Sequence, residues 1–489
     1  MANASERLSK KKRPNILLIT ADEMRHDCFG AAGHPLVRTP NLDALARRGV
    51  RFTNAYTPFP VCVPARMSIM TGQYARAHGL ISNRGFLAKD QATLPRSLSE
   101  AGYRTAAIGK MHFWPPYNGY GFQSMCLAEQ HGQGYKIDDY HSEYLAQRGL
   151  VDMWDLWDQQ RAYRANAPRE YWESFGARAS ELPEEHYHTT WIADRTIDCL
   201  NEDDDRPFFI WTSFIKPHHP FDPPKPWDEM YNPADVPAPH DQAHALAKPL
   251  MTQGGRKDPR EAFFDLTQMS EEAYRRVAAL YYATISHIDH HVGRILKTLE
   301  ELGKIDDTLV IFTSDHGDYM GAYGLILKHP NVPYDALAKV PMVVAGPGVS
   351  EGVVSDDLVS LIDLFPTAAA LAGSELPRSV QGRDLSDLLS GKRQEGKAFR
   401  DAIFVESGGI KAVRTDRYKY LYDHSNGLEE LYDLSEDPDE LHDLAAVPEE
   451  RGRVGEVVRE MRDLLLGWLI ETESDRHTTE WRFDNLMPQ

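Results

Sequence analysis

The sequence predicts an α/β protein with a mostly parallel central sheet sandwiched by helices, followed by a smaller antiparallel-sheet-plus-helix domain. Short continuous apolar runs, typical of strands buried on both faces, alternate with helical patterns along most of the chain. After about residue 385 this alternation stops, and short strands follow one another directly. We therefore expect a main α/β domain over residues 1–384 and a C-terminal subdomain over residues 385–489.

The main domain contains clear signals for both kinds of element. The helix expected at residues 39–49 has Thr39 as its cap, Pro40 at its first position and Gly49 at its end. The longest expected helix is followed by Gly303 as a C-cap. The full set of expected helices in this domain is 39–49, 94–102 and 270–302. The expected strands are 15–20, 103–108, 207–214, 309–313 and 340–348.

Two long stretches lack this periodicity. Residues 113–190 are rich in Trp, Tyr, Gly and Gln, and residues 221–262 are rich in Pro and polar residues. We expect long loops and short helices there, with the first stretch covering a substrate cleft. The C-terminal subdomain is expected to contain strands at 402–405, 411–414, 418–422 and 431–433 and a helix at about 448–470.

Composition restricts the partners of the chain. Its 489 residues are 42% hydrophobic and 26% charged, with a net charge of −19, so nucleic acid and an anionic membrane are not expected as partners. The apolar run at residues 16–19 is too short for a signal peptide or a membrane span, which predicts a cytoplasmic protein. Four scattered cysteines form no disulfide framework. The oligomeric state is left open.

Four polar clusters follow predicted strands: Asp22-Glu23, Lys110 with His112, His218, and Asp315-His316. In an open α/β sheet, ligands bind outside the carboxyl ends of the strands, so these clusters are expected to meet. Carboxylates with one imidazole suit Ca²⁺, Mg²⁺ or Mn²⁺ better than a thiolate-loving metal.

Cys62 belongs to the run Val61-Cys62-Val63-Pro64-Ala65-Arg66-Met67-Ser68 and could join these clusters. A free cysteine is most often a small buried hydrophobe. A cysteine-phosphatase nucleophile would need an arginine six positions later, where this chain has Ser68.

The pattern Cys62-x-Pro64-x-Arg66 resembles the modification motif of the type I, formylglycine-dependent sulfatases of the alkaline-phosphatase-like superfamily. The resemblance covers nearly the whole chain, and its other motifs follow the family's order. They are residues 15–22, Gly109-Lys110-x-His112, Pro217-His218-x-Pro220-Phe221, Ser314-Asp315-His316-Gly317, Lys328, Gly346-Pro347-Gly348, Glu430 to Leu434 and Asp437-Pro438.

The resemblance implies a role for each matching residue. Cys62 would be oxidised by a modifying enzyme to formylglycine, the nucleophile, and Arg66 would orient it. Lys110 and Lys328 would hold sulfate oxygens, and Asn83 would add a contact. His112 would promote breakdown of the sulfated enzyme, and His218 would protonate the leaving alcohol. The expected metal is Ca²⁺, with Mn²⁺ or Mg²⁺ as alternatives, and it would be held by Asp22, Glu23, residue 62, Asp315 and His316.

Three features depart from the resemblance or compete with it. Glu23 stands where relatives carry a second Asp, Asn or Gln, and Tyr323 where many have His, which is expected to alter substrate contacts. His287 and His291 have the i, i+4 spacing of a zinc pair but lack the glutamate of H-E-x-x-H. With His290 they are interpreted as helix-surface histidines.

The resemblance therefore predicts a sulfuric ester hydrolase that cleaves a small sulfate monoester, with aryl, sugar and choline sulfates all open. The aromatic residues of 113–190 favour a ring-shaped substrate. The alternative is a phosphonate monoester hydrolase or phosphodiesterase on the same scaffold, but such relatives tend to lack the pair Lys110 and His112. An inactive binding protein would be expected to have lost Cys62, Arg66 or Asp315.

Overall fold

An eight-stranded, mostly parallel sheet forms the centre of the molecule. The computed structural model describes residues 13–129, 139–392, 397–447 and 451–473. In spatial order the strands are β4 (Ser124–Leu127), β3 (Arg104–Gly109), β5 (Phe208–Pro217), β1 (Asn15–Asp22), β6 (Thr308–Ser314), β7 (Lys339–Ala345), β2 (Gly49–Tyr56) and β8 (Val353–Ser360). Only β7 runs against its neighbours β6 and β2. The predicted fold class is confirmed.

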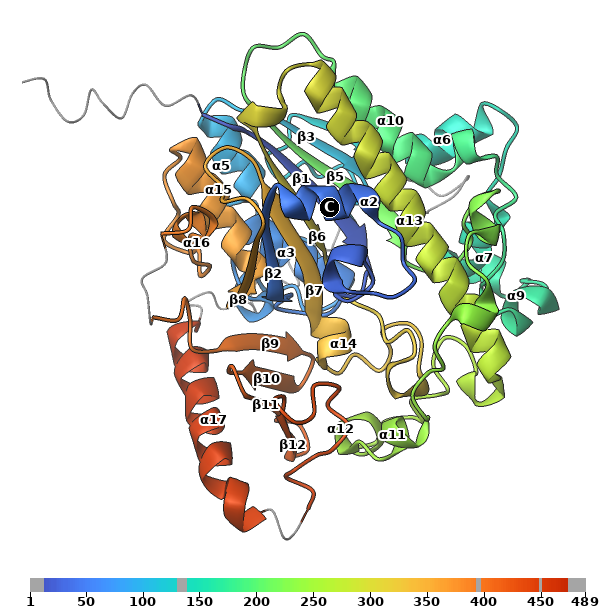
Figure 1. Cartoon of the computed structure of the whole chain (residues 1–489), viewed down its shortest axis with the longest axis vertical. Coiled ribbons are helices and arrows are strands. Elements are labelled where there is room, and N and C mark those ends of the chain that lie inside the picture. Colours follow the sequence, from blue (N-terminus) through green and yellow to red (C-terminus); the bar gives the residue numbers. More distant parts are fainter. Residues whose placement is uncertain (1–12, 130–138, 393–396, 448–450, 474–489) are drawn as a thin grey trace, which may run out of the picture.

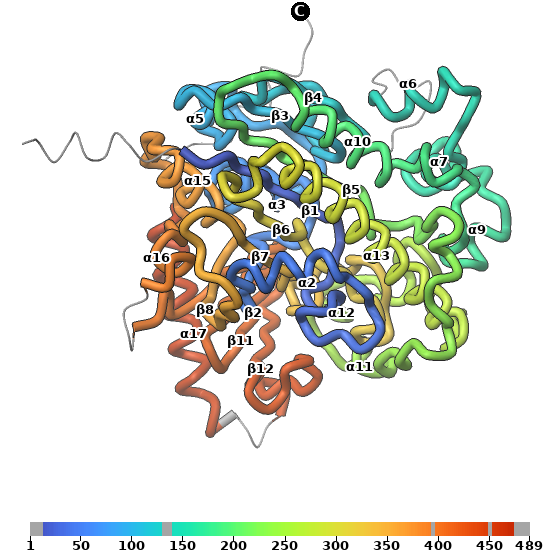
Figure 2. The backbone as a smooth tube through the Cα atoms, turned by 45° about the horizontal axis from the view of Figure 1, so that its top comes forward, coloured from blue at the N-terminus to red at the C-terminus, as the bar shows by residue number. Residues whose placement is uncertain are grey.

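Helices cover both faces of this sheet because its strands are apolar on both sides. Along β1, Leu17 and Ile19 pack into one hydrophobic core, whereas Ile16 and Leu18 pack into the other. Figures 1 and 2 show the two helical layers. One layer contains α2 (Pro40–Arg47), α10 (His188–Leu200) and α13 (Glu271–Glu301). The other contains α3 (Cys62–Thr71), α5 (Leu94–Glu100) and α15 (Leu364–Ala372).

The strand order brings the predicted polar clusters together. Strands β3, β5, β1 and β6 are parallel neighbours, so their carboxyl ends lie at one edge of the sheet. These ends lead directly into Lys110, His218, Asp22 and Asp315. Four segments that are far apart in sequence therefore deliver their polar residues to one place.

Two helix-end predictions differ from the structure around α2. Thr39 precedes the helix, but its hydroxyl donates to Asp43 at 3.1 Å and does not cap the backbone. Gly49 opens β2, where a Cβ atom would lie 2.0 Å from the carbonyl oxygen of Val344. Close packing of β2 on β7 requires this glycine, and the helix end does not.

The irregular stretch after His112 contains short helices, as predicted. It also contains the edge strand β4, which was not predicted from the sequence. The short helices across the chain are α4 (Ala75–His78), α6 (Tyr140–Ala146), α7 (Met153–Gln159), α8 (Arg161–Arg164), α9 (Arg169–Glu173), α11 (Ala243–Leu246), α12 (Pro249–Thr252), α14 (Asp335–Ala338) and α16 (Ser386–Leu389). No helix in the part of the chain that the structure describes combines the length and apolarity needed to cross a bilayer.

The C-terminal region is a four-stranded antiparallel sheet with one long helix, as Figure 1 shows. Its strands are β9 (Ile403–Ser407), β10 (Ile410–Arg414), β11 (Tyr418–Asp423) and β12 (Leu428–Asp433), and its helix is α17 (Arg451–Glu471). One face of the sheet packs on α17 through Tyr420 and Leu431, while Val405 and Leu421 join the core of the main domain. The domain boundary at residue 385 stays a prediction.

A buried lysine connects this small sheet to the main domain. Lys419 on β11 has no exposed side-chain surface, and its amine lies 2.7 Å from both Asp335 of α14 and Glu440. Removing one partner from a buried ion pair leaves uncompensated charge in a low-dielectric interior.

We expect Lys419→Met to lower the free energy of unfolding by about 3–5 kcal/mol, because two buried carboxylates lose their cation. Urea denaturation followed by circular dichroism measures the change. The control is Arg417→Met, which removes the half-exposed pair with Asp433 and should cost about 0–1 kcal/mol. Equal costs for the two variants would contradict the role given to Lys419.

Candidate active site

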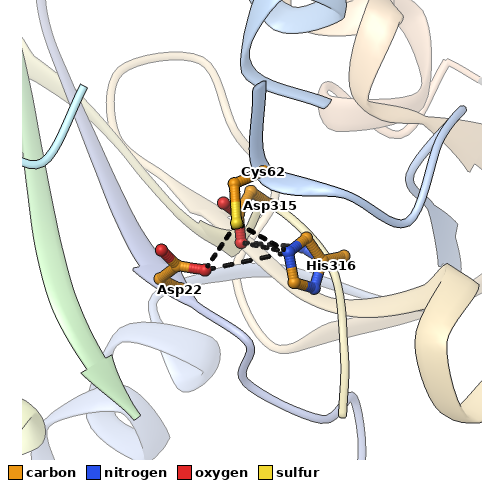
Figure 3. A group of neighbouring side chains, drawn as sticks. All are labelled: Asp22, Cys62, Asp315 and His316. Carbon is orange, nitrogen blue, oxygen red and sulfur yellow. Dashed lines mark hydrogen bonds and ion pairs between the residues drawn. The ribbon is translucent and has the colours of Figure 1, made fainter. Parts of the chain in front are cut away.

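Asp22, Cys62, Asp315 and His316 form a compact buried cluster at the carboxyl edge of the main sheet. Figure 3 shows the four side chains pointing toward one another. The Cys62 sulfur lies 3.6 Å from Asp22 Oδ1 and 3.3 Å from His316 Nε2. His316 Nε2 is 3.8 Å from Asp22 and 3.9 Å from Asp315. The structure thus brings together residues 22, 62, 315 and 316, as predicted.

Local structure fixes the direction of two of these side chains. Cys62 is the first residue of α3, so the helix start holds its sulfur toward the strand ends. His316 Nδ1 lies 2.9 Å from the carbonyl oxygen of Gly317, and this hydrogen bond directs Nε2 into the cluster. A backbone carbonyl on the far nitrogen is the usual arrangement of a metal-ligating histidine.

Three cations balance the buried carboxylates. Arg66, which is fully buried, donates from Nε to Asp315 at 2.9 Å and lies 3.6 Å from Asp22. Lys110 Nζ lies 2.6 Å from Asp22 Oδ2, and Lys328 donates to the Cys62 sulfur at 3.4 Å. The predicted residues Arg66, Lys110 and Lys328 therefore all contact the cluster.

These neighbours shift the protonation equilibria of the site. Burial alone would raise the pKa of Asp22, but Lys110, His218 and Arg66 outweigh it and hold that pKa well below its usual value. Burial opposes protonation of His316, but Asp315 and Cys62 raise its pKa to about 9. Both shifts indicate that the closely spaced anionic groups of this pocket favour a bound cation.

The donor set fits a divalent cation. Two carboxylates, one oriented imidazole and residue 62 offer ligand atoms within 4.8 Å of one another. Oxygen-rich sites with few nitrogen donors suit Ca²⁺, Mg²⁺ or Mn²⁺.

Glu23 lies beside this cluster, in a second group with His218 and His219. Its backbone has a left-handed φ of 66°, and its carboxylate contacts Lys328 and lies 3.9 Å from His218 Nε2. Its other oxygen, Oε2, is buried without a hydrogen-bond partner in the described part of the chain. Glu23 is thus positioned to neutralise Lys328, and its role as a metal ligand stays a prediction.

Asn83 contacts the residue that follows Cys62, and His112 lies two positions after Lys110. Asn83 is exposed, and its Oδ1 accepts the backbone N–H of Val63 in the first turn of α3, at 3.1 Å. His112 has a left-handed φ of 58°. Its backbone N–H donates to Glu129 at 2.9 Å, and the N–H of Met111 donates to the same carboxylate at 2.8 Å.

Sequence reasoning missed Glu129, although a signal for it was available. This buried carboxylate follows β4, the parallel neighbour of β3, so it reaches the site by the same strand-end rule as Lys110. Burial raises its pKa to about 7 despite the two backbone donors. It holds the loop that presents Lys110 and His112, and recognition of the short edge strand would have predicted it.

One sequence interpretation is wrong and another stays a prediction. Tyr323 is 1% exposed and packs against Tyr319 and Tyr334, and its expected effect on substrate contacts stays a prediction. His287 and His291, expected on a helix surface, are 0% and 2% exposed. The reason is that α13 is covered by α10 and by the chain around Trp227, so a second face of this helix is also buried.

Comparisons with known proteins agree with the geometry. The family model described as sulfatase matches residues 14–374, and the model described as N-sulphoglucosamine sulphohydrolase, C-terminal, matches residues 323–466. An arylsulfatase of Clostridium perfringens is 34% identical over 447 residues, covering 86% of this chain and 87% of the relative. A choline-sulfatase of Rhizobium meliloti is 30% identical over 433 residues, covering 84% and 78%.

A solved structure of an enzyme with the alternative function has the same architecture as this chain. The phosphonate monoester hydrolase of Agrobacterium radiobacter superposes with a TM-score of 0.78 at 27% identity, covering 94% of this chain and 96% of that one.

Proposed function

The chain belongs to the sulfatase family and is a sulfuric ester hydrolase, and we propose that it cleaves a ring-bearing sulfate monoester with formylglycine at position 62 and one bound Ca²⁺. The observation that carries this proposal is the convergence of residues 22, 62, 315 and 316 with the amines of Lys110 and Lys328. Formylglycine would require a modifying enzyme that acts on Cys62.

Formylglycine and a bound cation would supply two kinds of chemistry that the unmodified side chains lack. The aldehyde hydrate of formylglycine would provide the nucleophilic oxygen, which Arg66 is positioned to orient. A divalent cation held by Asp22, residue 62, Asp315 and His316 would neutralise sulfate oxygens and favour loss of a proton from the hydrate. Glu23 is a further candidate ligand from its neighbouring position.

The two lysines would bind the sulfate group. Lys110 is 3% exposed, and Lys328 is mostly buried, with 16% of its side chain exposed. Burial alone would lower the pKa of Lys110, but Asp22 and Cys62 raise it above its usual value, so the amine stays charged. In a water-poor site, such fixed charges stabilise the negative charge that develops as the ester bond breaks.

His218 is proposed to protonate the leaving alcohol. Its Nδ1 lies 2.6 Å from the carbonyl oxygen of His219, which leaves Nε2 facing Glu23 and the site. Burial, Lys110 and Lys328 hold the pKa of His218 well below its usual value. A bound sulfate would offset the charge of both lysines and so raise this pKa when the proton is needed. His112 is proposed to act in the later step that releases sulfate.

Exposed aromatic residues in the segments that carry Asn83 and His112, and one ring in contact with them, support a ring-bearing leaving group. Trp114, two residues after His112, is 50% exposed, and Tyr117 and Tyr140 are 41% and 48% exposed with their rings in edge contact. Phe86, in the same segment as Asn83, is 38% exposed. These surfaces suit stacking on a ring, and an aryl sulfate fits them better than a small aliphatic ester.

The first prediction concerns the modification. Protein produced together with a formylglycine-generating enzyme should show loss of the thiol sulfur at Cys62 by peptide mass spectrometry. Cys62→Ser should lose multiple turnover, because a serine ester could not expel sulfate by the hydrate route. Cys126→Ser, at a cysteine outside the site, should retain turnover. Full activity with an unmodified Cys62 would contradict the proposal.

The second prediction concerns the cation. Elemental analysis of wild-type protein dialysed against Ca²⁺ should find about one ion per chain. Asp315→Ala should lose the ion and the activity together, since it removes a carboxylate of the donor set. The control is Asp306→Ala, at a carboxylate that is 94% exposed, which should keep both. Retention of the ion and turnover by Asp315→Ala would refute the ligand assignment.

The third prediction separates sulfatase from the alternative phosphonate or phosphodiester hydrolase. Lys110→Ala should lower turnover of an aryl sulfate by roughly two to three orders of magnitude, the scale for losing one transition-state charge contact. Turnover of a phosphate diester should fall much less. The measurement is a steady-state screen of aryl sulfate, sugar sulfate, phosphate diester and phosphonate monoester, with the exposed Lys89→Ala as control. Equal losses on sulfate and phosphate esters would show that Lys110 does not set the preference.

A further inference from the structure

A second convergence of metal-ligating atoms lies outside the catalytic cluster and shares no residue with it. His287 and His291 occupy successive turns of α13, and Glu184 comes from η3 (Glu184–His186), about a hundred residues earlier in the chain. The two histidines are buried, whereas 35% of the Glu184 side chain is exposed. A path from solvent therefore exists on the carboxylate side.

The distances match a three-ligand zinc site. His287 Nε2 lies 2.9 Å from His291 Nε2 and 3.5 Å from Glu184 Oε1, and all three ligand atoms are within 4.8 Å of one another. Ligands about 2.0–2.2 Å from a tetrahedral Zn²⁺ lie roughly 3.3 Å apart, so small adjustments suffice. Two imidazoles and one carboxylate are also a common zinc donor set.

Neighbouring groups hold the carboxylate and both rings in place. The indole N–H of Trp227 donates to Glu184 Oε1 at 2.9 Å, and the Trp227 ring lies 4.9 Å from that of His287. The Thr190 hydroxyl lies 3.1 Å from His291 Nε2.

Arg294 opposes metal binding through its hydrogen bond with His291. Its guanidinium donates to His291 Nδ1 at 3.0 Å, which places the imidazole proton on Nε2. Without metal, this Nε2–H can donate to His287 Nε2 and link the two rings by a hydrogen bond. Zinc would require the proton on Nδ1 and withdrawal of the guanidinium. Arg294 is 39% exposed and pairs with Asp194 at 2.8 Å, so it can move while keeping that partner.

We propose that Glu184, His287 and His291 bind one Zn²⁺, with water in the fourth position, and that this ion ties the segment before α10 to the long helix α13. The site is separate from the catalytic cation and does not depend on the proposed reaction. Its consequence is structural, because it would link two elements that cover one face of the main sheet.

The direct test locates the ion. Crystals of the wild-type protein soaked in ZnCl₂ should give an anomalous peak at the zinc absorption edge between residues 184, 287 and 291. Crystals of His287→Gln should lack this peak and retain any peak at the catalytic cluster. A wild-type crystal without density between the three side chains, or an undiminished peak in His287→Gln, would overturn the proposal.

A titration in solution measures the energetics. Chelator-treated protein carrying Asp315→Ala, which weakens the catalytic cation site, is titrated with ZnCl₂ against a chromophoric zinc indicator. Adding His287→Gln should weaken zinc binding by at least about 100-fold. Loss of a group that only orients a ligand already costs up to about 100-fold, and His287 is itself a proposed ligand. Glu184→Gln, at a partly exposed position that preserves the fold, should also weaken it. Equal affinity in either variant would count against the site.

Two further variants separate a built site from loose histidine binding. His290→Gln removes the exposed neighbour on the same helix turn and should leave zinc affinity unchanged. Arg294→Gln should tighten binding, because the competing donor at His291 Nδ1 is lost. Weaker binding in His290→Gln than in His287→Gln, or unchanged or weaker binding in Arg294→Gln, would contradict the geometry.

Discussion

The buried ion pairs of Arg66 hold the functional edge of the main sheet together. Two carboxylates at the ends of β1 and β6 lie in an interior where an unpaired charge would be strongly destabilising. Arg66 contacts both of them and also donates to the Ser213 hydroxyl of β5 and to the carbonyl oxygen of Lys110 after β3. One side chain from the first turns of α3 thus joins four strand ends and places Cys62 above them.

The same constraint explains which parts of the site could be predicted from the sequence. Strand ends were recognisable because β1, β3, β5 and β6 are apolar on both faces, and parallel strands deliver their carboxyl ends to one edge. The family resemblance then supplied roles for the residues found there. Glu129 escaped because its strand β4 is only four residues long and partly exposed. The reversed direction of β7 also left no signal, since its apolar sequence reads like that of the parallel strands of the same sheet.

The histidines of α13 show where periodicity stops being informative. A helix pattern identifies one apolar face and assigns the remaining positions to solvent, which is correct only when a single layer covers the helix. Here α10, η3 and Trp227 cover a second face, and their position depends on contacts across the irregular residues 113–262. Polar residues on that second face are therefore buried, and only the three-dimensional structure reveals that Glu184 lies beside the two histidines.

Tyr323 connects the C-terminal sheet to the loop that carries Lys328. Tyr323 lies in the loop between β6 and β7 that also carries Lys328, and its hydroxyl lies 3.5 Å from Glu440. Glu440 accepts the backbone N–H of Asp335 at 2.6 Å, and Lys248 lies 4.4–4.6 Å from the rings of Tyr323, Tyr334 and Tyr432. Cation–π contacts of this kind are strongest where water is excluded.

This aromatic cage anchors the loop from the side of the C-terminal sheet, while the Lys328 end contacts Glu23 and Cys62. The buried tyrosine thus holds the loop in place. The antiparallel sheet contributes no residue to the cluster of Asp22, Cys62, Asp315 and His316, yet it fixes the segment that brings Lys328 beside that cluster.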